Sequence, residues 1–406
     1  MEETIKEKST QSFLGDLTKV VRQNVRDYAI YIALFVIMLF FTIFTNGAFF
    51  SSRNLNDLIN QCGYIAVIAV GMTLVIVIRH IDLSVGYLAG FLGAVAAILM
   101  VNFGAPWWVA VLVVLVLGVL AELVTGFLVA SVGIPAFVAT LAGWLAYRGL
   151  EQGLLANTGT IIIPDETFNA ISNGFIPDIF PANSAFLPGI HKLTLLIGLV
   201  AIVIFVANAI NNRKVKRSYN FEVLPNDIFI LQQVFISILI AGLTWLMASY
   251  KGISWTAVVV LVIVLVYNFI TTRMVLGRHI YAVGGNPEAA TLSGISVKRI
   301  TYIVFASMGL LTALGGIMIA SRFRSATPTA GMLLETDAIA AAYVGGVSAS
   351  GGVGKVTGSI IGALVMASLV NGMALMTVDQ SVQYVIRAAV LVLAVVFDVT
   401  TRRRAK

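Results

Sequence analysis

Long runs without a single charged side chain are the feature that most constrains this chain. A helix needs about 20 apolar residues to cross the hydrocarbon core of a bilayer. Seven runs reach that length without any Asp, Glu, Lys or Arg, and each predicts one membrane crossing. They are residues 28–52, 58–78, 193–212, 228–250, 252–272, 300–321 and 356–378.

Two further apolar stretches are too long for one crossing and contain helix-stopping sequences. The first breaks before Pro106, and the second breaks at Gly133 and Pro135. Dividing them predicts three more crossings, at residues 83–101, 107–131 and 135–155. The first run of the chain, 28–52, is longer than the apolar core of a cleavable signal peptide, so it is interpreted as a crossing.

The composition excludes a water-soluble fold, because 59% of the 406 residues are hydrophobic and only 11% are charged. We therefore expect an all-α, polytopic helical bundle in a membrane, with about 10 to 12 crossings. The apolar stretch at 337–346 is short and predicts a half-helix or broken helix. The single cysteine, Cys62, lies within a predicted crossing and is expected to serve packing.

The net charge of +7 arises from short basic clusters between the crossings, which is typical of topology signals and argues against a nucleic-acid surface. Placing both termini in the cytoplasm puts most of these clusters inside. The predicted organisation is a cytoplasmic segment 1–27, a transmembrane domain 28–399 with a periplasmic segment 156–192, cytoplasmic loops 211–227 and 273–299, and a basic cytoplasmic tail 400–406. The periplasmic segment can be a plain connector or a docking surface.

Few ionisable residues fall within the predicted crossings, and such residues are energetically unfavourable in lipid unless they are paired or hydrated. Arg148 and Glu151 are three residues apart on one helix and can pair with each other. Glu122 can bond to a neighbouring helix or take part in transport. Glu335, Asp337 and the junction of His80 with Asp82 complete this group.

A path for a neutral polar solute needs hydroxyl, amide and aromatic side chains rather than fixed charges, because such a solute is held by hydrogen bonds and ring stacking. Hydroxyl and amide side chains also join helices in any bundle, so a structural role is open for each candidate. The candidates for such a path are Asp82, Ser84, Asp337, Ser348, Ser350 and Asn371.

An internal repeat is suggested when residues 82–90 are aligned with residues 350–358. Gly86 and Gly90 then match Gly354 and Gly358, a spacing suited to close helix packing. In each copy an Asp or Ser can cap the helix that follows. Coincidence among glycine-rich membrane helices is the alternative.

The most specific motif lies in the loop 273–299. Pro287 is suited to open a short helix, Glu288 complements its positive end, and Gly294 can end it. Glu288, Ala289, Ala290 and Gly294 match the E-A-A-x-x-x-G pattern of the cytoplasmic coupling loop of ATP-binding-cassette importer permeases, which the loop therefore resembles.

Two further motifs narrow the resemblance to the permeases of ribose, arabinose and xylose importers. The segment 71–86 is similar to their G-M-T-x-V-I…G-I-D-L-S-V-G signature, with Arg79 and His80 in place of the usual small residues. The segment 335–354 resembles their E-x-D-A-I-A…G-G-x-S-x-x-G-G-x-G block. The extra residues at about 213–250 favour the enlarged xylose type.

The resemblance implies a permease in the bacterial inner membrane that pairs with a second copy. It further implies a cytoplasmic ATPase partner that binds ATP and magnesium, and a periplasmic protein that delivers a sugar such as xylose. No cofactor or metal is expected in this chain, since Gly354 and Lys355 do not form a complete phosphate loop and no nucleophile with a base appears. The alternative is an ion-coupled secondary transporter using Glu122, Asp82 or Asp337. A membrane enzyme is the remote third possibility.

Overall fold

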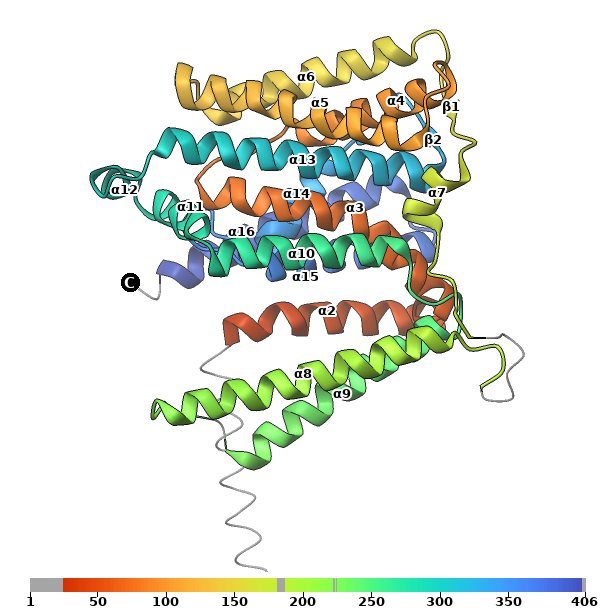
Figure 1. Ribbon diagram of the computed structural model, residues 1–406, viewed down its shortest axis with the longest axis vertical. Helices are drawn as coiled ribbons and strands as arrows, with labels where there is room; N and C mark the ends of the chain where they lie inside the picture. Colours follow the sequence, from red (N-terminus) through yellow and green to blue (C-terminus); the bar gives the residue numbers. More distant parts are fainter. Residues whose placement is uncertain (1–24, 181–186, 222, 224, 404–406) are drawn as a thin grey trace, which may run out of the picture. The chain divides into compact units, whose positions relative to one another are not determined.

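The computed structural model describes residues 25–180, 187–221, 223 and 225–403, and these residues form a helical protein (Figure 1). They fall into two compact units. The smaller unit comprises Met1–Ile32, Phe50–Asn56 and Phe175–Ile253, as far as these are described, and the larger comprises Ala33–Phe49, Asp57–Gly174 and Ser254–Lys406. Residues 1–24 of the predicted segment 1–27 and residues 404–406 of the predicted tail 400–406 lie outside the described residues.

Each predicted crossing corresponds to a helix. Eight of the described helices are long and apolar enough to span a membrane, and α4 and part of α2 are shorter apolar helices. The chain is therefore a polytopic helical membrane protein. The helices that match the predicted crossings, together with the last long helix α16, are α2 (Val25–Phe44), α3 (Ser52–Val77), α4 (Val85–Val101), α5 (Trp107–Phe127), α6 (Ala136–Leu155), α8 (Lys192–Ser218), α9 (Asn226–Ala248), α10 (Trp255–Arg273), α13 (Val297–Phe323), α15 (Val356–Leu375) and α16 (Gln380–Arg403).

Some helix boundaries differ from the sequence prediction. Helix α2 stops at Phe44 instead of continuing to residue 52, because Asn46 and Gly47 adopt left-handed backbone conformations with φ of 52° and 84°. A single 3₁₀ turn, η1 (Ala48–Phe50), then leads into α3. Helix α5 continues as a π-helical turn, η2 (Leu128–Val132), before the predicted break.

Helix α16 escaped the search for charge-free runs because Arg387 and Asp398 lie within it. Helix α14 (Leu334–Val344) has only 11 residues and rises about 16 Å, roughly half the thickness of a bilayer core. The expectation of a half-helix around 337–346 is thus confirmed.

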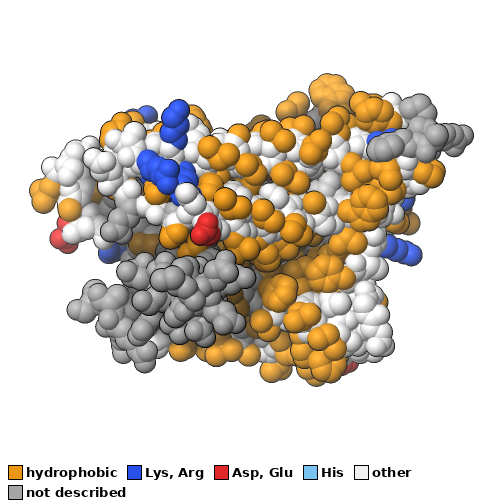
Figure 2. Space-filling view, turned by 90° about the horizontal axis from the view of Figure 1, so that it is seen from below, with side chains coloured by type: hydrophobic (Ala, Val, Ile, Leu, Met, Phe, Trp, Pro, Cys, Tyr) orange, Lys and Arg blue, Asp and Glu red, His pale blue; other side chains and the backbone are white. Residues whose placement is uncertain are grey.

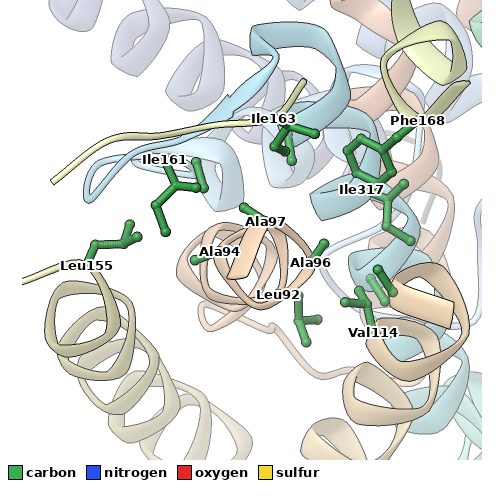
Figure 3. Packing of buried hydrophobic residues seen from close by; sticks show 14 of the residues in the cluster. Leu92, Ala94, Ala96, Ala97, Val114, Leu155, Ile161, Ile163, Phe168 and Ile317 are labelled. Carbon is green, nitrogen blue, oxygen red and sulfur yellow. The ribbon is translucent and has the colours of Figure 1, made fainter. Parts of the chain in front are cut away.

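The core of the larger unit lies where α4 meets α5, α7 and α13 (Figure 3). Leu92 and Val114 are fully buried between α4 and α5, and Ile317 of α13 packs into the same cluster. The remaining members of the cluster on α4 are mostly alanines, which let neighbouring helices approach closely. These alanines are Ala94, Ala96 and Ala97.

The outer surface is strongly apolar. Figure 2 shows hydrophobic side chains over much of one face, with Lys and Arg side chains toward the two ends of the view. Large hydrophobic side chains are exposed along α2, α8, α9, α10 and α16. A surface of this kind suits contact with lipid, in agreement with the predicted crossings.

The two ends of the larger unit carry different short elements (Figure 1). At one end, strand β1 (Ile161–Ile162) pairs antiparallel with β2 (Ser325–Ala326), next to helix α7 (Glu166–Asn173). The Ser321 hydroxyl of α13 accepts a hydrogen bond from Ser172 N at 2.9 Å and donates one to Asn169 O at 3.0 Å. The first half of the predicted periplasmic segment 156–192 is therefore folded onto α13. At the opposite end of α13 lie α11 (Val275–Gly285) and α12 (Pro287–Leu292).

Candidate functional site

Helix α12 has the local structure that its sequence predicts. It begins at Pro287, and the Asn286 side chain caps it by accepting hydrogen bonds from Glu288 N at 3.0 Å and Ala289 N at 3.1 Å. Gly294 follows the helix with φ of 81°, and Ile295 N donates to Ala290 O at 2.9 Å. The short helix is thus held at both ends by its own sequence.

Helix α12 presents an exposed surface of small, acidic and apolar side chains. Ala290 is buried and anchors the helix, while Glu288 and Ala289 are exposed or partly exposed. Leu292 is 91% exposed, more than any other large hydrophobic side chain among the described residues. Leu292 thus adds an apolar side chain to the exposed surface of the helix whose sequence matches the coupling-loop pattern. Sequence reasoning missed Leu292, because a lone apolar residue in a loop has no periodicity to mark it.

A buried polar cluster joins the start of α4 to α5. Asp82 Oδ1 accepts hydrogen bonds from Ser84 N at 2.9 Å and Ser84 Oγ at 2.7 Å, and Ser84 Oγ also lies 3.0 Å from Glu122 Oε1. All three side chains are 0% exposed. Asp82 Oδ2 and Glu122 Oε2 have no hydrogen-bond partner among the described residues. The cluster therefore combines the sequence candidates Asp82, Ser84 and Glu122.

The half-helix α14 starts from irregular backbone that is covered by α4. A Cβ atom at Gly86 would lie 2.7 Å from Gly331 O, and one at Gly331 would lie 2.0 Å from Gly86 O. Only glycines permit this close contact between α4 and the segment before α14. In the first turn of α14, Glu335 Oε1 accepts a hydrogen bond from Trp144 Nε1 at 3.2 Å.

Asp337 forms an ion pair with Arg387 of α16, with 3.2 Å between Oδ2 and Nη1. Both side chains are largely shielded, with 9% of the Asp337 surface and 19% of the Arg387 surface exposed. This contact explains how α16 accommodates an arginine within an apolar helix, because the charge is neutralised inside the bundle. Asp337 is thus engaged in its own ion pair with Arg387.

The possible ion pair between Arg148 and Glu151 does not form. The Arg148 guanidinium lies 5.6 Å from the Tyr87 ring centre and 5.4 Å from that of Trp144. Glu151 turns into the bundle and is 0% exposed, with its Oε1 against Gly90. The two side chains diverge because three residues on α6 separate an exposed face from a buried one.

The remaining path candidates lie in separate places. Ser348 is buried and its backbone N–H donates to Val353 O at 2.9 Å, while Ser350 is exposed in the same loop. Asn371 lies near the end of α15. A cavity of about 290 Å³ opens between α3, α10 and α15, and its lining, which includes Cys62, is apolar. Among the candidates, hydrogen bonds join Asp82 to Ser84, whereas Asp337, Ser348, Ser350 and Asn371 belong to other elements, so their role in a path stays a prediction.

The suggested repeat is only partly matched by local geometry. Gly86 and Gly90 lie inside the first turns of α4, as expected, and both contact neighbouring segments closely. Helix α15 begins at Val356, so Gly354 precedes it and does not open it. The expectation that both helices open with this glycine spacing is wrong for the second copy, because Gly354 lies in the irregular segment that precedes α15. Gly358 still approaches Gly345, since its Cβ would lie 2.1 Å from Gly345 O.

Comparison with known proteins places this architecture in a family. The model of the family described as branched-chain amino acid transport system / permease component matches residues 54–395. The chain belongs to this family. That match takes in α12, the Asp82 cluster and the half-helix α14 together.

Relatives within the family are similar over nearly the whole chain. The xylose transport system permease protein XylH of Escherichia coli K12 is 38% identical over 391 residues, which is 96% of each chain. XylH of Haemophilus influenzae is 36% identical over 95% of this chain and 99% of its own. The ribose import permease protein RbsC of Escherichia coli K12 is 35% identical over 86% of this chain and 87% of its own. No solved structure matches.

Proposed function

We propose that the chain is the membrane-spanning subunit of an ATP-driven importer that carries a pentose of the xylose or ribose kind across the bacterial inner membrane. The observation that carries the proposal is helix α12, which exposes Glu288, Ala289 and Leu292 at one end of the bundle. The similarity to sugar permeases over nearly the whole chain supports it. Xylose is the first candidate, because the similarity to the xylose permeases covers more of the chain than that to the ribose permeases.

In this proposal the chain catalyses no covalent step. A second copy completes the pathway, and a periplasmic protein delivers the sugar. A cytoplasmic ATPase, which itself binds ATP and magnesium, binds to α12. The chain's own contribution is to change the accessibility of a path between its helices. Both termini and α12 lie in the cytoplasm in this arrangement, and β1, β2 and α7 face the periplasm.

The test is ATP hydrolysis and sugar uptake in proteoliposomes that contain the chain with its ATPase and its binding protein. We expect Glu288→Arg and Gly294→Trp to abolish ATPase association and sugar-stimulated hydrolysis. Lys216→Ala is the control, since it removes an exposed positive charge of α8 outside the coupling loop. Xylose, ribose and arabinose are compared as substrates. Uptake that needs no ATPase, or that ignores the α12 variants, would refute the proposal.

The second candidate function is an ion-coupled sugar transporter, favoured by the buried carboxyls of Asp82 and Glu122. Each carboxyl has an oxygen without a hydrogen-bond partner among the described residues. A charged side chain inside a membrane is costly, about 3 kcal/mol at the bilayer centre, and buried carboxyls within membrane bundles are typical of proton and cation relays. Glu122→Gln separates the candidates: ATP-driven uptake survives this change, whereas ion-coupled uptake is lost.

A further inference from the structure

Three separate parts of the chain meet directly beside α12. They are the end of α3 at residues 77–79, the end of α11 at residues 284–285, and the loop residues 351–352 before α15. We call this meeting point the inner junction. All three parts belong to the larger unit of the protein.

Arg79 connects two of these parts through its side chain. Its Nε donates a hydrogen bond to Gly284 O at 2.7 Å, and its Nη2 donates one to Gly285 O. These carbonyl groups belong to the last turn of α11, where a cation is favourable and where backbone acceptors lack helical donors. The next residue, Asn286, is the cap of α12. The Arg79 guanidinium therefore holds the backbone directly in front of the proposed coupling helix.

The backbone at the inner junction is packed too closely to slide. Gly352 N donates to Val77 O at 2.8 Å, and a Cβ at Gly284 would lie 1.9 Å from Val77 O. A Cβ at Gly351 would lie 2.4 Å from Arg79 Cγ. A movement of the α11 end must therefore displace α3 and the 351–352 loop as well, or break these contacts.

The inner junction is also joined to the interior of the bundle. The Tyr281 hydroxyl of α11 donates to Gly354 O at 2.6 Å, just before α15. Farther along α3, the hydroxyls of Thr73 and Ser359 form a buried hydrogen bond between α3 and α15. Hydrogen bonds thus connect the segment directly before α12 with two core helices, α3 and α15.

We propose that Arg79 is a positioning residue that fastens the coupling helix to α3 and to the loop before α15. The inference rests on the proposed function, because it assumes that a partner ATPase moves α12. Arg79 adopts a left-handed backbone conformation with φ of 67°, which disfavours most residues and directs its side chain toward α11. Without the guanidinium, α12 remains available to the ATPase, but its movement is no longer passed fully to α3.

The test compares sugar transported per ATP hydrolysed in wild-type protein, Arg79→Gly and Arg79→Lys. Glycine accepts the backbone conformation of Arg79 and removes the guanidinium, whereas lysine keeps the charge but not the two-pronged geometry. We expect Arg79→Gly to retain ATPase binding and basal hydrolysis while its transport ratio falls about tenfold, a typical size for coupling between two sites. Arg79→Lys should fall between, and Lys216→Ala should match wild type.

A second measurement separates coupling from folding. Hydrogen exchange should accelerate in residues 284–292 and 348–354 of Arg79→Gly, but not in α4 or α5. An unchanged transport ratio in Arg79→Gly, or unchanged exchange at both segments, overturns the inference. If Arg79→Gly fails to fold, Arg79→Lys decides in its place, and a wild-type ratio there overturns the inference. Wild-type protein that moves no sugar with its ATPase instead refutes the proposed function.

Discussion

Helices α13 and α9 are almost equally apolar, yet the protein uses them in opposite ways. Within the 18-residue apolar stretch of each helix, 72% is buried inside the protein in α13, compared with 6% in α9. The difference follows small residues: Gly309 and Gly316 of α13 lie against the backbone of α5 and α4, while Gly242 of α9 has no atom within 4 Å of its Cβ position. In a bilayer, apolarity places a helix in the membrane, and side-chain size decides whether it packs against others.

The largest expected effect comes from truncating a buried side chain of the packed helix α13. Phe305 of α13 is 0% exposed and Phe235 of α9 is 60% exposed. Phe305→Ala should lower the free energy of unfolding by about 3–5 kcal/mol through lost packing and a cavity. Phe235→Ala, its matched control, should cost less than about 0.5 kcal/mol. Denaturant titration in detergent measures both, and equal losses would break the comparison.

Helix α16 offers an exception that sharpens the comparison. It is as little buried as α9, but the ion pair between Arg387 and Asp337 attaches it to α14. Arg387→Met should cost about 3 kcal/mol, because it leaves a shielded carboxylate without its partner. The double variant Asp337→Asn with Arg387→Met should recover most of this loss in the same titration. Additive losses in the double variant would show that the two side chains act independently.

Adding one side chain at a helix contact should have a smaller effect. A Cβ at Gly309 would lie 2.1 Å from Gly118 O, so Gly309→Val must push α13 away from α5 at a cost of about 1–3 kcal/mol. Gly242→Val places the same side chain in open space on α9. Thermal unfolding followed by size-exclusion chromatography compares the two. A similar shift in both variants would contradict the role of small residues.

The smallest effect is expected at the start of α8, where Asp178 holds the chain. Burial by itself raises the pKa of Asp178, but backbone N–H groups of Phe180, Lys192 and Leu193, with His191 nearby, outweigh it and lower the pKa below its usual value. Because the folded pKa is lowered, this stabilisation is complete above the unfolded value of about 3.9 and is lost as the pH falls through the folded pKa. The difference in unfolding free energy between wild type and Asp178→Asn should therefore shrink in acid. A difference that is constant from about pH 6 to about pH 3, a range that spans the unfolded pKa, would argue against this anchor.

The sequence was sufficient for the helical membrane class, because a charge-free run of crossing length is rare outside a membrane helix. It also located α12, where Pro287, Glu288 and Gly294 act through local geometry alone. Helix α16 was missed because Arg387 interrupts its apolar run, and the residue that neutralises this charge is 50 residues away in the chain, where no local pattern reveals it. The spacing of Arg148 and Glu151 along α6 also did not reveal which side chains contact the Arg148 guanidinium. Two aromatic rings, one of them on α4, compete there with a carboxylate one turn away.

The candidate path shows the same limit. Asp82 and Ser84 are neighbours in sequence, and their bond follows from local turn geometry. The approach of Glu122 to Ser84 depends on how α4 packs against α5, which no local pattern specifies. Sequence therefore identified polar candidates one at a time, but it did not say which of them meet.

The exposure of Leu292 has a consequence for the cell as well as for transport. If the ATPase covers α12 as proposed, Leu292 is buried in the assembled importer and exposed in unassembled copies, which should then be the less stable form and turn over faster. The amount of permease in the membrane would then follow the supply of the ATPase.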